Sequence, residues 1–275
     1  MACTAIVAGD GPVRRVSPEE AAAYRGSGFV WVHIEGADEA DLALLRNGSG
    51  IPDVAASGLV ATETRPRCDQ IEDGALVNLR GLGIEDTSDS DRLVSIRLWV
   101  RGGKINSVSR RPLAATAEVL GKMDAGAIHD PGDLVVAFAR AISKQLDPEV
   151  AALGDRLDDF ESEVEPRQIY RVRTAIARIR SDAIAYRRFV SPDRDALLTL
   201  AGLDVPWLQE DDRLHIREAA DRFARMTEEL EAVRERSALV HEQLTDLRAQ
   251  QLDTRSLVLA IGAFLFLPLS FIPSR

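Results

Sequence analysis

The chain has 275 residues and a formal net charge of −10, from 34 Lys plus Arg against 44 Asp plus Glu. This balance argues against nucleic acid or an anionic membrane surface as the main partner, because both bind clustered cationic side chains. Cys3 and Cys68 make neither a disulfide framework nor a paired-cysteine metal motif, so a reducing compartment is expected. Cations are the better candidate partners.

Residues 1–112 have the composition of an α/β domain. β-Branched and aromatic residues gather in four segments bounded by turn residues, which predicts strands at 29–34, 75–80, 92–100 and 104–109. Arg101-Gly102-Gly103 predicts a hairpin between the last two strands. Short helices are expected at 17–24, 38–46 and 53–58. The acidic stretch 84–91 is expected to be a solvated loop rather than a cation site.

Residues 113–204 are predicted to be helical and to contain an αα-hairpin that turns at Glu165-Pro166. On both arms the apolar residues alternate in spacings of three and four, which is typical of helices that pack side by side. The first arm is acidic over 147–165, and the second is rich in arginine over 167–188. We expect the two arms to neutralise each other. The alternative is an acidic tip that gathers cations beside a basic collar.

Residues 205–255 are predicted to form one long stalk helix. Its apolar residues alternate by three and four without a break, which indicates a helix packed along one seam. The seam consists of Ile216, Ala219, Phe223, Met226, Leu230, Val233, Ser237, Val240, Leu244 and Leu247.

Residues 256–274 carry no formal charge and are predicted to be a first, incomplete membrane helix that continues the stalk. Such a segment is roughly 28 Å long as a helix, close to the thickness of a bilayer core. The alternative is a buried C-terminal core helix. Arg248 and Arg255 precede the segment, and the positive-inside tendency then leaves residues 1–255 in the cytoplasm.

A second stripe runs along the same helix, about 200° around from the apolar seam. It is acidic before residue 256, and small or hydroxylated for most of the remainder. Identical helices in a ring would turn such a face toward a hydrated ion pathway, whereas the alternative is ordinary solvent-facing charge. The stripe consists of Glu242, Asp246, Ala249, Asp253, Ser256, Ala260, Ala263, Leu267 and Ser270.

The sequence gives no support for an enzyme. It contains no GxGxxG, Walker-type, GxSxG or HExxH pattern, and its four histidines are scattered. His33, in a predicted strand, is expected to be a structural hydrogen-bonding residue.

The order of these parts resembles the CorA-type divalent-cation transporters, and within them the ZntB-like zinc transporter branch. The resemblance is carried by TETRPRCDQIEDGALVNLRG at 62–81, DRLVSIRLWVRGGKINSVSRRPL at 91–113, Val205-Pro206-Trp207, and FLPLSF at 266–271. It implies an α+β fold: an N-terminal α/β cytoplasmic domain, an αα-hairpin, and a very long stalk helix running into a C-terminal membrane helix.

The resemblance also implies a homopentamer in the inner, cytoplasmic membrane that handles divalent cations, zinc or magnesium, as transported or regulatory ligands, with no enzyme cofactor and no nucleic acid. It places Glu242, Asp253, Ser256, Leu259, Leu267 and Ser270 along the ion pathway. Leu259 comes from the resemblance alone, while Asp246 and Ala263 come from the stripe.

In the family, a Gly-x-Asn motif and a second membrane helix follow the FLPLSF-like block. Here Ile272 is followed only by Pro273-Ser274-Arg275, which suggests a C-terminally truncated form. Two functions are therefore weighed: divalent cation transport, with this chain as the cytoplasmic funnel and pore-lining helix, or a membrane-anchored, non-transporting oligomeric scaffold or regulatory subunit. Carboxylate and hydroxyl groups do not select one metal.

Overall fold

The computed structural model describes residues 2–9, 11–36, 50–62, 65–84, 92–162 and 169–270. The predicted helix at 38–46 and the acidic loop, apart from its first residue, lie outside these residues. The chain forms two compact units. The first comprises Met1–Ala151 and Ala185–Glu229, and the second comprises Ala152–Ile184 and Leu230–Arg275.

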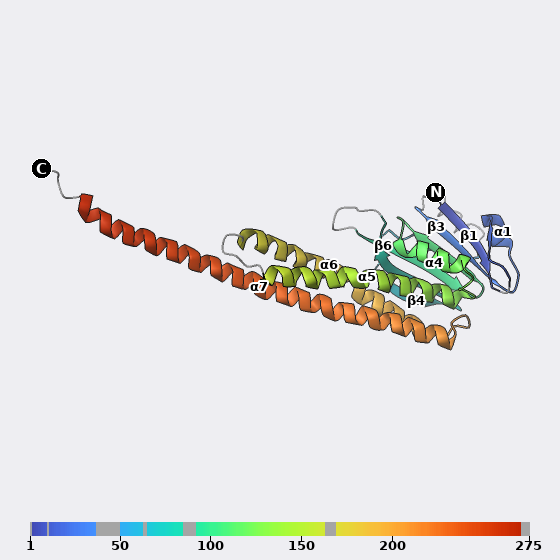
Figure 1. The fold of residues 1–275 in the computed structure, drawn as a ribbon. Coiled ribbons are helices and arrows are strands. Elements are labelled where there is room, and N and C mark those ends of the chain that lie inside the picture. Colours follow the sequence, from blue (N-terminus) through green and yellow to red (C-terminus); the bar gives the residue numbers. More distant parts are fainter. Residues whose placement is uncertain are drawn as a thin grey trace. The chain divides into compact units, whose positions relative to one another are not determined.

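The first unit is built on a seven-stranded sheet with the order β2-β1-β3-β7-β6-β5-β4 (Figure 1). All neighbouring strands are antiparallel except β3 and β7, which run parallel. The strands are β1 Ala2–Ala8, β2 Arg14–Val16, β3 Phe29–Glu35, β4 Arg67–Ile71, β5 Gly74–Leu82, β6 Leu93–Arg101 and β7 Lys104–Ser109. The four predicted strands are confirmed, as β3, β5, β6 and β7.

Three strands were not predicted, for two reasons. β1 is rich in alanine, and its strand conformation comes from pairing with β3 along its whole length. β2 has three residues and β4 is largely exposed, so neither has the apolar composition of a central strand. Both lie at the edges of the sheet, where polar residues are normal because one side of the strand faces solvent.

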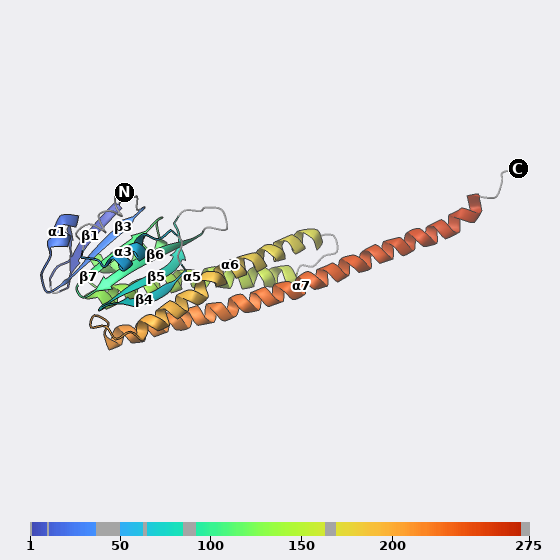
Figure 2. The same cartoon turned by 180° about the vertical axis from the view of Figure 1, so that it is seen from behind.

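Helices cover both faces of the sheet, α3 on one side and α4 with α5 on the other (Figures 1 and 2). Trp99 and Leu76 pack with Leu59 of α3. On the opposite face the Trp31 ring meets Phe138 of α5 edge-on at 5.8 Å. The central strands are therefore largely buried on both faces. The helices are α1 Pro18–Ala23, α3 Asp53–Val60, α4 Ala114–Asp124, α5 Pro131–Ser162, α6 Ile169–Ala201 and α7 Glu210–Ser270.

His33 belongs to a buried polar group inside this core, as predicted. Its Nδ1 lies 2.8 Å from the Ser107 hydroxyl, which also accepts a 2.8 Å hydrogen bond from Trp31 Nε1. Burial lowers the pKa of His33 to about 4, so the ring is neutral at physiological pH.

The long helices follow the predicted seams. On both arms of the hairpin, the described seam residues are buried except Phe160, which is half-buried. α7 begins at Glu210 and is continuous to Ser270. Within the described part of the chain, none of the helices has an apolar stretch long enough to cross a membrane. Residues 271–274 of the predicted membrane segment lie outside the described residues.

A buried carboxyl of α6 completes the backbone hydrogen bonding of β5. β4 pairs with β5 only as far as Asn78, so the Arg80 N–H lies beyond the end of this ladder. The Arg80 N–H instead donates to Asp193 Oδ1 at 3.0 Å. Asp193 is fully buried, and its desolvation raises the pKa of this carboxyl well above its usual value.

We expect Asp193→Ala to destabilise the protein by about 1–3 kcal/mol, because it leaves the Arg80 N–H buried without an acceptor. Asp193→Asn keeps an oxygen acceptor without a charge and should lose much less. Urea unfolding followed by tryptophan fluorescence measures both. Equal losses for the two variants would show that the hydrogen bond to Arg80 is unimportant.

Candidate functional site

The sequence-predicted pathway residues all lie on α7, in the second unit. The side chains of Glu242, Asp246 and Asp253 are exposed, and so are those of Ser256, Leu259 and Ala263. Leu267 and Ser270 belong to the helical backbone, but their side chains lie outside the described part.

The face of α7 opposite the acidic stripe is buried. Nine of the ten predicted seam residues, from Ile216 to Leu244, are buried, and only Leu247 is 42% exposed. In the second unit, the buried seam from Leu230 to Leu244 packs against the hairpin arms of α5 and α6. This packing uses one side of α7 and leaves Glu242 exposed, whereas Asp246 and Asp253 are exposed because they follow Leu244, the last buried residue of the seam.

Ion pairs hold the hairpin to α7. The Arg236 guanidinium lies 2.5 Å from Asp158 and 2.7 Å from Glu161 of α5, and these contacts raise the pKa of Arg236. Arg173 of α6 donates to His241 Nε2 at 3.3 Å. The acidic arm is therefore neutralised in part by Arg236 of α7. Across the hairpin, the Arg156–Asp182 pair at 3.6 Å joins a base of the acidic arm to an acid of the arginine-rich arm.

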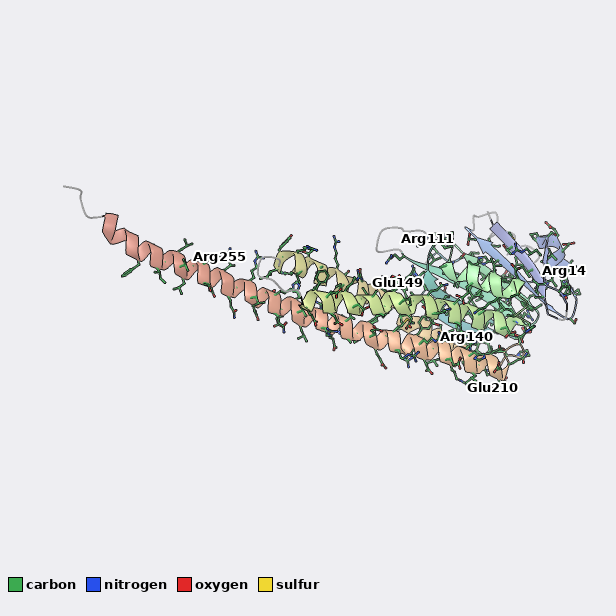
Figure 3. The ribbon with its side chains drawn as sticks, in the orientation of Figure 1. Arg14, Arg111, Arg140, Glu149, Glu210 and Arg255 are labelled. Carbon is green, nitrogen blue, oxygen red and sulfur yellow. The ribbon has the colours of Figure 1, made fainter. Side chains whose placement is uncertain are left out.

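Beyond Leu244, α7 leaves the hairpin. Every described side chain from Thr245 to Phe264 is exposed. Figure 3 shows Arg255 on this part of the helix, past the ends of α5 and α6. Large apolar side chains are among those left uncovered, which is unusual for a helix in water. They include Leu247, Leu252, Leu257, Val258, Leu259, Ile261 and Phe264.

Three carboxylates that were not singled out from the sequence meet in the first unit. One oxygen from each of Asp130, Asp133 and Asp212 lies within 4.8 Å of the others. A divalent cation takes oxygen ligands of this kind. Burial, followed by the charges of Asp130, Asp133 and Asp211, raises the pKa of Asp212 to about 6, although a hydrogen bond from the Gln209 N–H opposes this.

The same carboxylates cap two helices. Asp130 precedes α5 and accepts from the Asp133 N–H at 2.9 Å, while Asp133 accepts from the His129 N–H at 2.8 Å. Asp212 accepts from the Gln209 N–H at 2.8 Å at the start of α7. Acidic residues at helix N-termini satisfy free N–H groups and the helix dipole. Helix capping thus explains why these three carboxylates lie together. The sequence sign of a cap at α5 is Asp130 directly before Pro131, with Asp133 three residues after Asp130.

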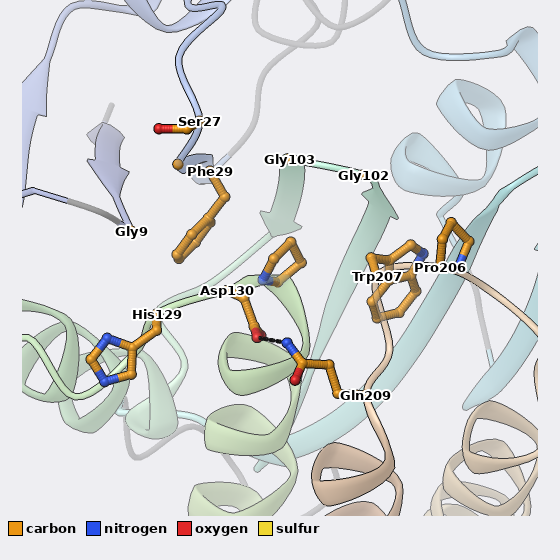
Figure 4. A pocket seen from close by; sticks show the side chains of 12 residues that line it. Gly9, Ser27, Phe29, Gly102, Gly103, His129, Asp130, Pro206, Trp207 and Gln209 are labelled. Carbon is orange, nitrogen blue, oxygen red and sulfur yellow. Dashed lines mark hydrogen bonds between the residues drawn. The ribbon is translucent and has the colours of Figure 1, made fainter.

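A shallow cavity of about 280 Å³ lies beside this cluster (Figure 4). Gly102 and Gly103 of the β6–β7 turn form part of its wall, opposite His129 and Trp207. The Gln209 amide donates to Asp130 Oδ2 at 2.7 Å, which links the starts of α5 and α7 at its rim. The cavity adjoins acidic groups and therefore disfavours anionic ligands.

The chain thus combines a sheet domain with three long helices, one of which carries an exposed acidic stripe. The family model "CorA-like Mg2+ transporter protein" matches residues 26–274. The chain belongs to this family, which confirms the resemblance stated from the sequence. Members of the family are transporters, so the expectation that the chain is not an enzyme is also confirmed.

Curated relatives cover most of the chain. The zinc transport protein ZntB of Pectobacterium atrosepticum is 28% identical over 243 residues, which is 88% of this chain and 74% of the relative. ZntB of Yersinia enterocolitica is 27% identical over 265 residues, which is 96% of this chain and 80% of the relative.

Solved structures share the fold. The full-length CmaX protein has a TM-score of 0.85 at 27% identity, with 99% of this chain and 84% of that chain covered. The ZntB cytoplasmic domain from Vibrio parahaemolyticus gives 0.78 at 18% identity, with 91% and 100% covered. The CorA magnesium transporter from Methanocaldococcus jannaschii gives 0.70 at 14% identity, with 99% and 84% covered. The last two likenesses concern the fold alone.

The raised pKa of Asp212 makes stability depend on pH. The native state holds this proton up to about pH 6, whereas the usual Asp value is 3.8, so the stabilisation is full below pH 3.8 and lost as the pH rises through 6. We expect Asp212→Asn, which keeps the oxygen acceptor, to melt at a higher temperature than the parent at pH 7.5.

The advantage of Asp212→Asn over the parent should shrink as the pH is lowered to 5, and thermal unfolding across this range measures it. Asp204→Asn, an exposed acid outside the cluster, is the control and should show no such trend. Parallel pH profiles for the parent and Asp212→Asn would contradict the assignment.

Proposed function

We propose that this chain serves divalent cation transport across the cytoplasmic membrane, as the cytoplasmic funnel and pore-lining helix of a homo-oligomer. The observation that carries the proposal is the acidic row on α7, where Glu242, Asp246 and Asp253 share one face and are all exposed. Glu242 lies opposite the last buried residues of the seam, and Asp246 and Asp253 follow Leu244, where burial of the seam ends. Family membership supplies the class of activity, and five copies are expected from the same resemblance.

The physical role proposed for the stripe is electrostatic. Carboxylates repeated around a shared axis lie close together in a confined space and repel one another. Divalent cations relieve this repulsion, and a ring of acids raises their local concentration at the pathway entrance. Ser256 and Ala263, farther along α7, leave room for a hydrated ion because their side chains are small.

The membrane assignment rests on sequence and family. Residues 256–274 are proposed as the first membrane helix, and residues 1–255 as the cytoplasmic part, with Arg248 and Arg255 on the cytoplasmic side of the boundary. The proposed parts along the chain remain 1–112, 113–204, 205–255 and 256–274.

Zinc is the proposed cargo, with magnesium as the competing choice. The curated relatives are named as zinc transport proteins, whereas the family model is named for Mg²⁺. The stripe itself offers carboxylates, hydroxyls and small side chains, which do not separate the two ions. A direct comparison of both ions is therefore part of the test.

Replacing Glu242, Asp246 and Asp253 with their amides should lower the initial rate of divalent cation entry into proteoliposomes by at least about tenfold, because the acidic field that concentrates the ion is removed. The full chain is reconstituted, and entry of Zn²⁺ and of Mg²⁺ is followed with an indicator trapped inside.

The control triple variant carries Asp155→Asn, Asp195→Asn and Asp204→Asn, which are exposed acids outside α7 with the same total change of charge. It should transport like the parent. Equal loss in both triple variants would assign the effect to net charge. A parent chain that assembles but moves neither ion would favour a membrane-anchored, non-transporting oligomer and overturn the proposal.

A further inference from the structure

A groove lies on the second unit where α7 passes Glu161, near the end of α5. It has a volume of about 280 Å³ and is lined by apolar and polar side chains of α7, with Glu161 of α5 and Arg236 on its rim. Its apolar lining is not covered by the chain, since Leu239 is 60% exposed and Leu247 is 42% exposed. The α7 side of the groove, named here the groove flank, consists of Leu239, Gln243 and Leu247.

The groove flank has a defined position relative to the acidic stripe. Gln243 and Leu247 each follow a stripe acid by one residue, and one residue turns a helix by about 100°. A residue that comes one position before a stripe residue is turned by about 100° in the opposite direction, away from the groove flank. This second surface, named here the arginine flank, consists of Thr245, Arg248 and Leu252, all of them exposed.

The two flanks are complementary in charge. The groove is lined by Glu161 and Arg236, and Arg236 also pairs with Asp158 outside the lining. These three groups together leave one net negative charge. Arg248 carries a positive charge on the arginine flank, and no ion pair of Arg248 occurs among the described residues. Leu252, 57% exposed, adds an apolar side chain beside it.

We propose that the groove flank of one chain receives the arginine flank of a second copy, with Arg248 of one copy against Glu161 of the next. This inference rests on the proposed function, because it describes how the copies meet around the acidic stripe. One chain cannot make the contact with itself, because its two flanks lie on opposite sides of the same rigid helix.

The contact joins two different surfaces and is therefore heterologous. Heterologous contacts repeat from copy to copy and form a ring when the rotation between copies closes, whereas a contact between two identical surfaces stops at a dimer. The arrangement turns Glu242 and Asp246 of every copy toward the same side, which is what a shared ion pathway requires. The groove thus sets the order of the copies, and Arg248 acts as a positioning residue for the assembly.

Disulfide cross-linking distinguishes the two kinds of contact. The full chain in detergent, with Cys3→Ser and Cys68→Ser, receives Gln243→Cys on the groove flank, Thr245→Cys on the arginine flank, or both. Under mild oxidation we expect covalent species larger than a dimer from the double variant only. Efficient dimers from Gln243→Cys alone would overturn the inference, since they require two groove flanks in contact.

Charge reversal tests the role of Arg248. We expect Arg248→Glu to raise the protein concentration for half-assembly by at least about tenfold, because like charges then face each other at every contact of the ring. Adding Glu161→Gln should restore part of the loss, because it removes one of the two like charges that then face each other, while Arg236 keeps Asp158 as a partner. Arg178→Glu, at an exposed position of α6, is the matched control and should assemble like the parent.

Sedimentation separates failure of this inference from failure of the proposed function. A parent that assembles and transports, while Arg248→Glu assembles normally and the double cysteine variant gives no cross-link, would overturn the groove contact alone. A parent that stays monomeric at tens of micromolar would overturn the ring itself, and the groove contact with it.

Discussion

The arrangement of the second unit depends on a single constraint, the one-sided burial of α7. A helix buries only part of its circumference against a two-helix partner, and here that part is the seam that ends at Leu244. Everything opposite the seam remains available for ions or other copies. Because the hairpin ends where it does, α7 also continues for many residues without any contact from its own chain, and apolar side chains such as Leu257 and Phe264 stay exposed.

The first unit satisfies a different constraint, the hydrogen bonding of a sheet that is buried on both faces. Its central strands are largely buried, so polar side chains inside them need hydrogen-bond partners from the protein. His33, Trp31 and Ser107 provide them for one another within the sheet. Asp193 provides a partner for a backbone N–H from α6, where the neighbouring strand has already ended. The Asp193 contact also fixes α6 to the sheet at a defined position, which nonpolar packing alone does with less specificity.

Acidic residues have two distinct roles in this chain, and their surroundings separate them. Asp130 accepts a hydrogen bond from the Asp133 N–H in the first turn of α5, while Asp133 and Asp212 accept from the His129 and Gln209 N–H groups just before α5 and α7. Their oxygens are therefore already engaged in the fold. Glu242, Asp246 and Asp253 lie in the middle of a helix whose N–H groups are satisfied, and their side chains are free for other charges. A cluster of acids is thus weaker evidence for ion handling than an exposed row of them.

The sequence by itself determined the strands β3, β5, β6 and β7, both hairpin arms, and the seam and stripe of α7. These features repeat with the period of their own secondary structure, so local spacing is sufficient to find them. The tertiary structure alone decided the edge strands β1, β2 and β4, whose residues become strands through pairing with a distant segment. It also decided the meeting of Asp130 with Asp212 and the contact of Arg236 with Glu161. Each of these contacts joins residues far apart in the chain. The spacing of residues within one segment does not determine which distant segment they will meet.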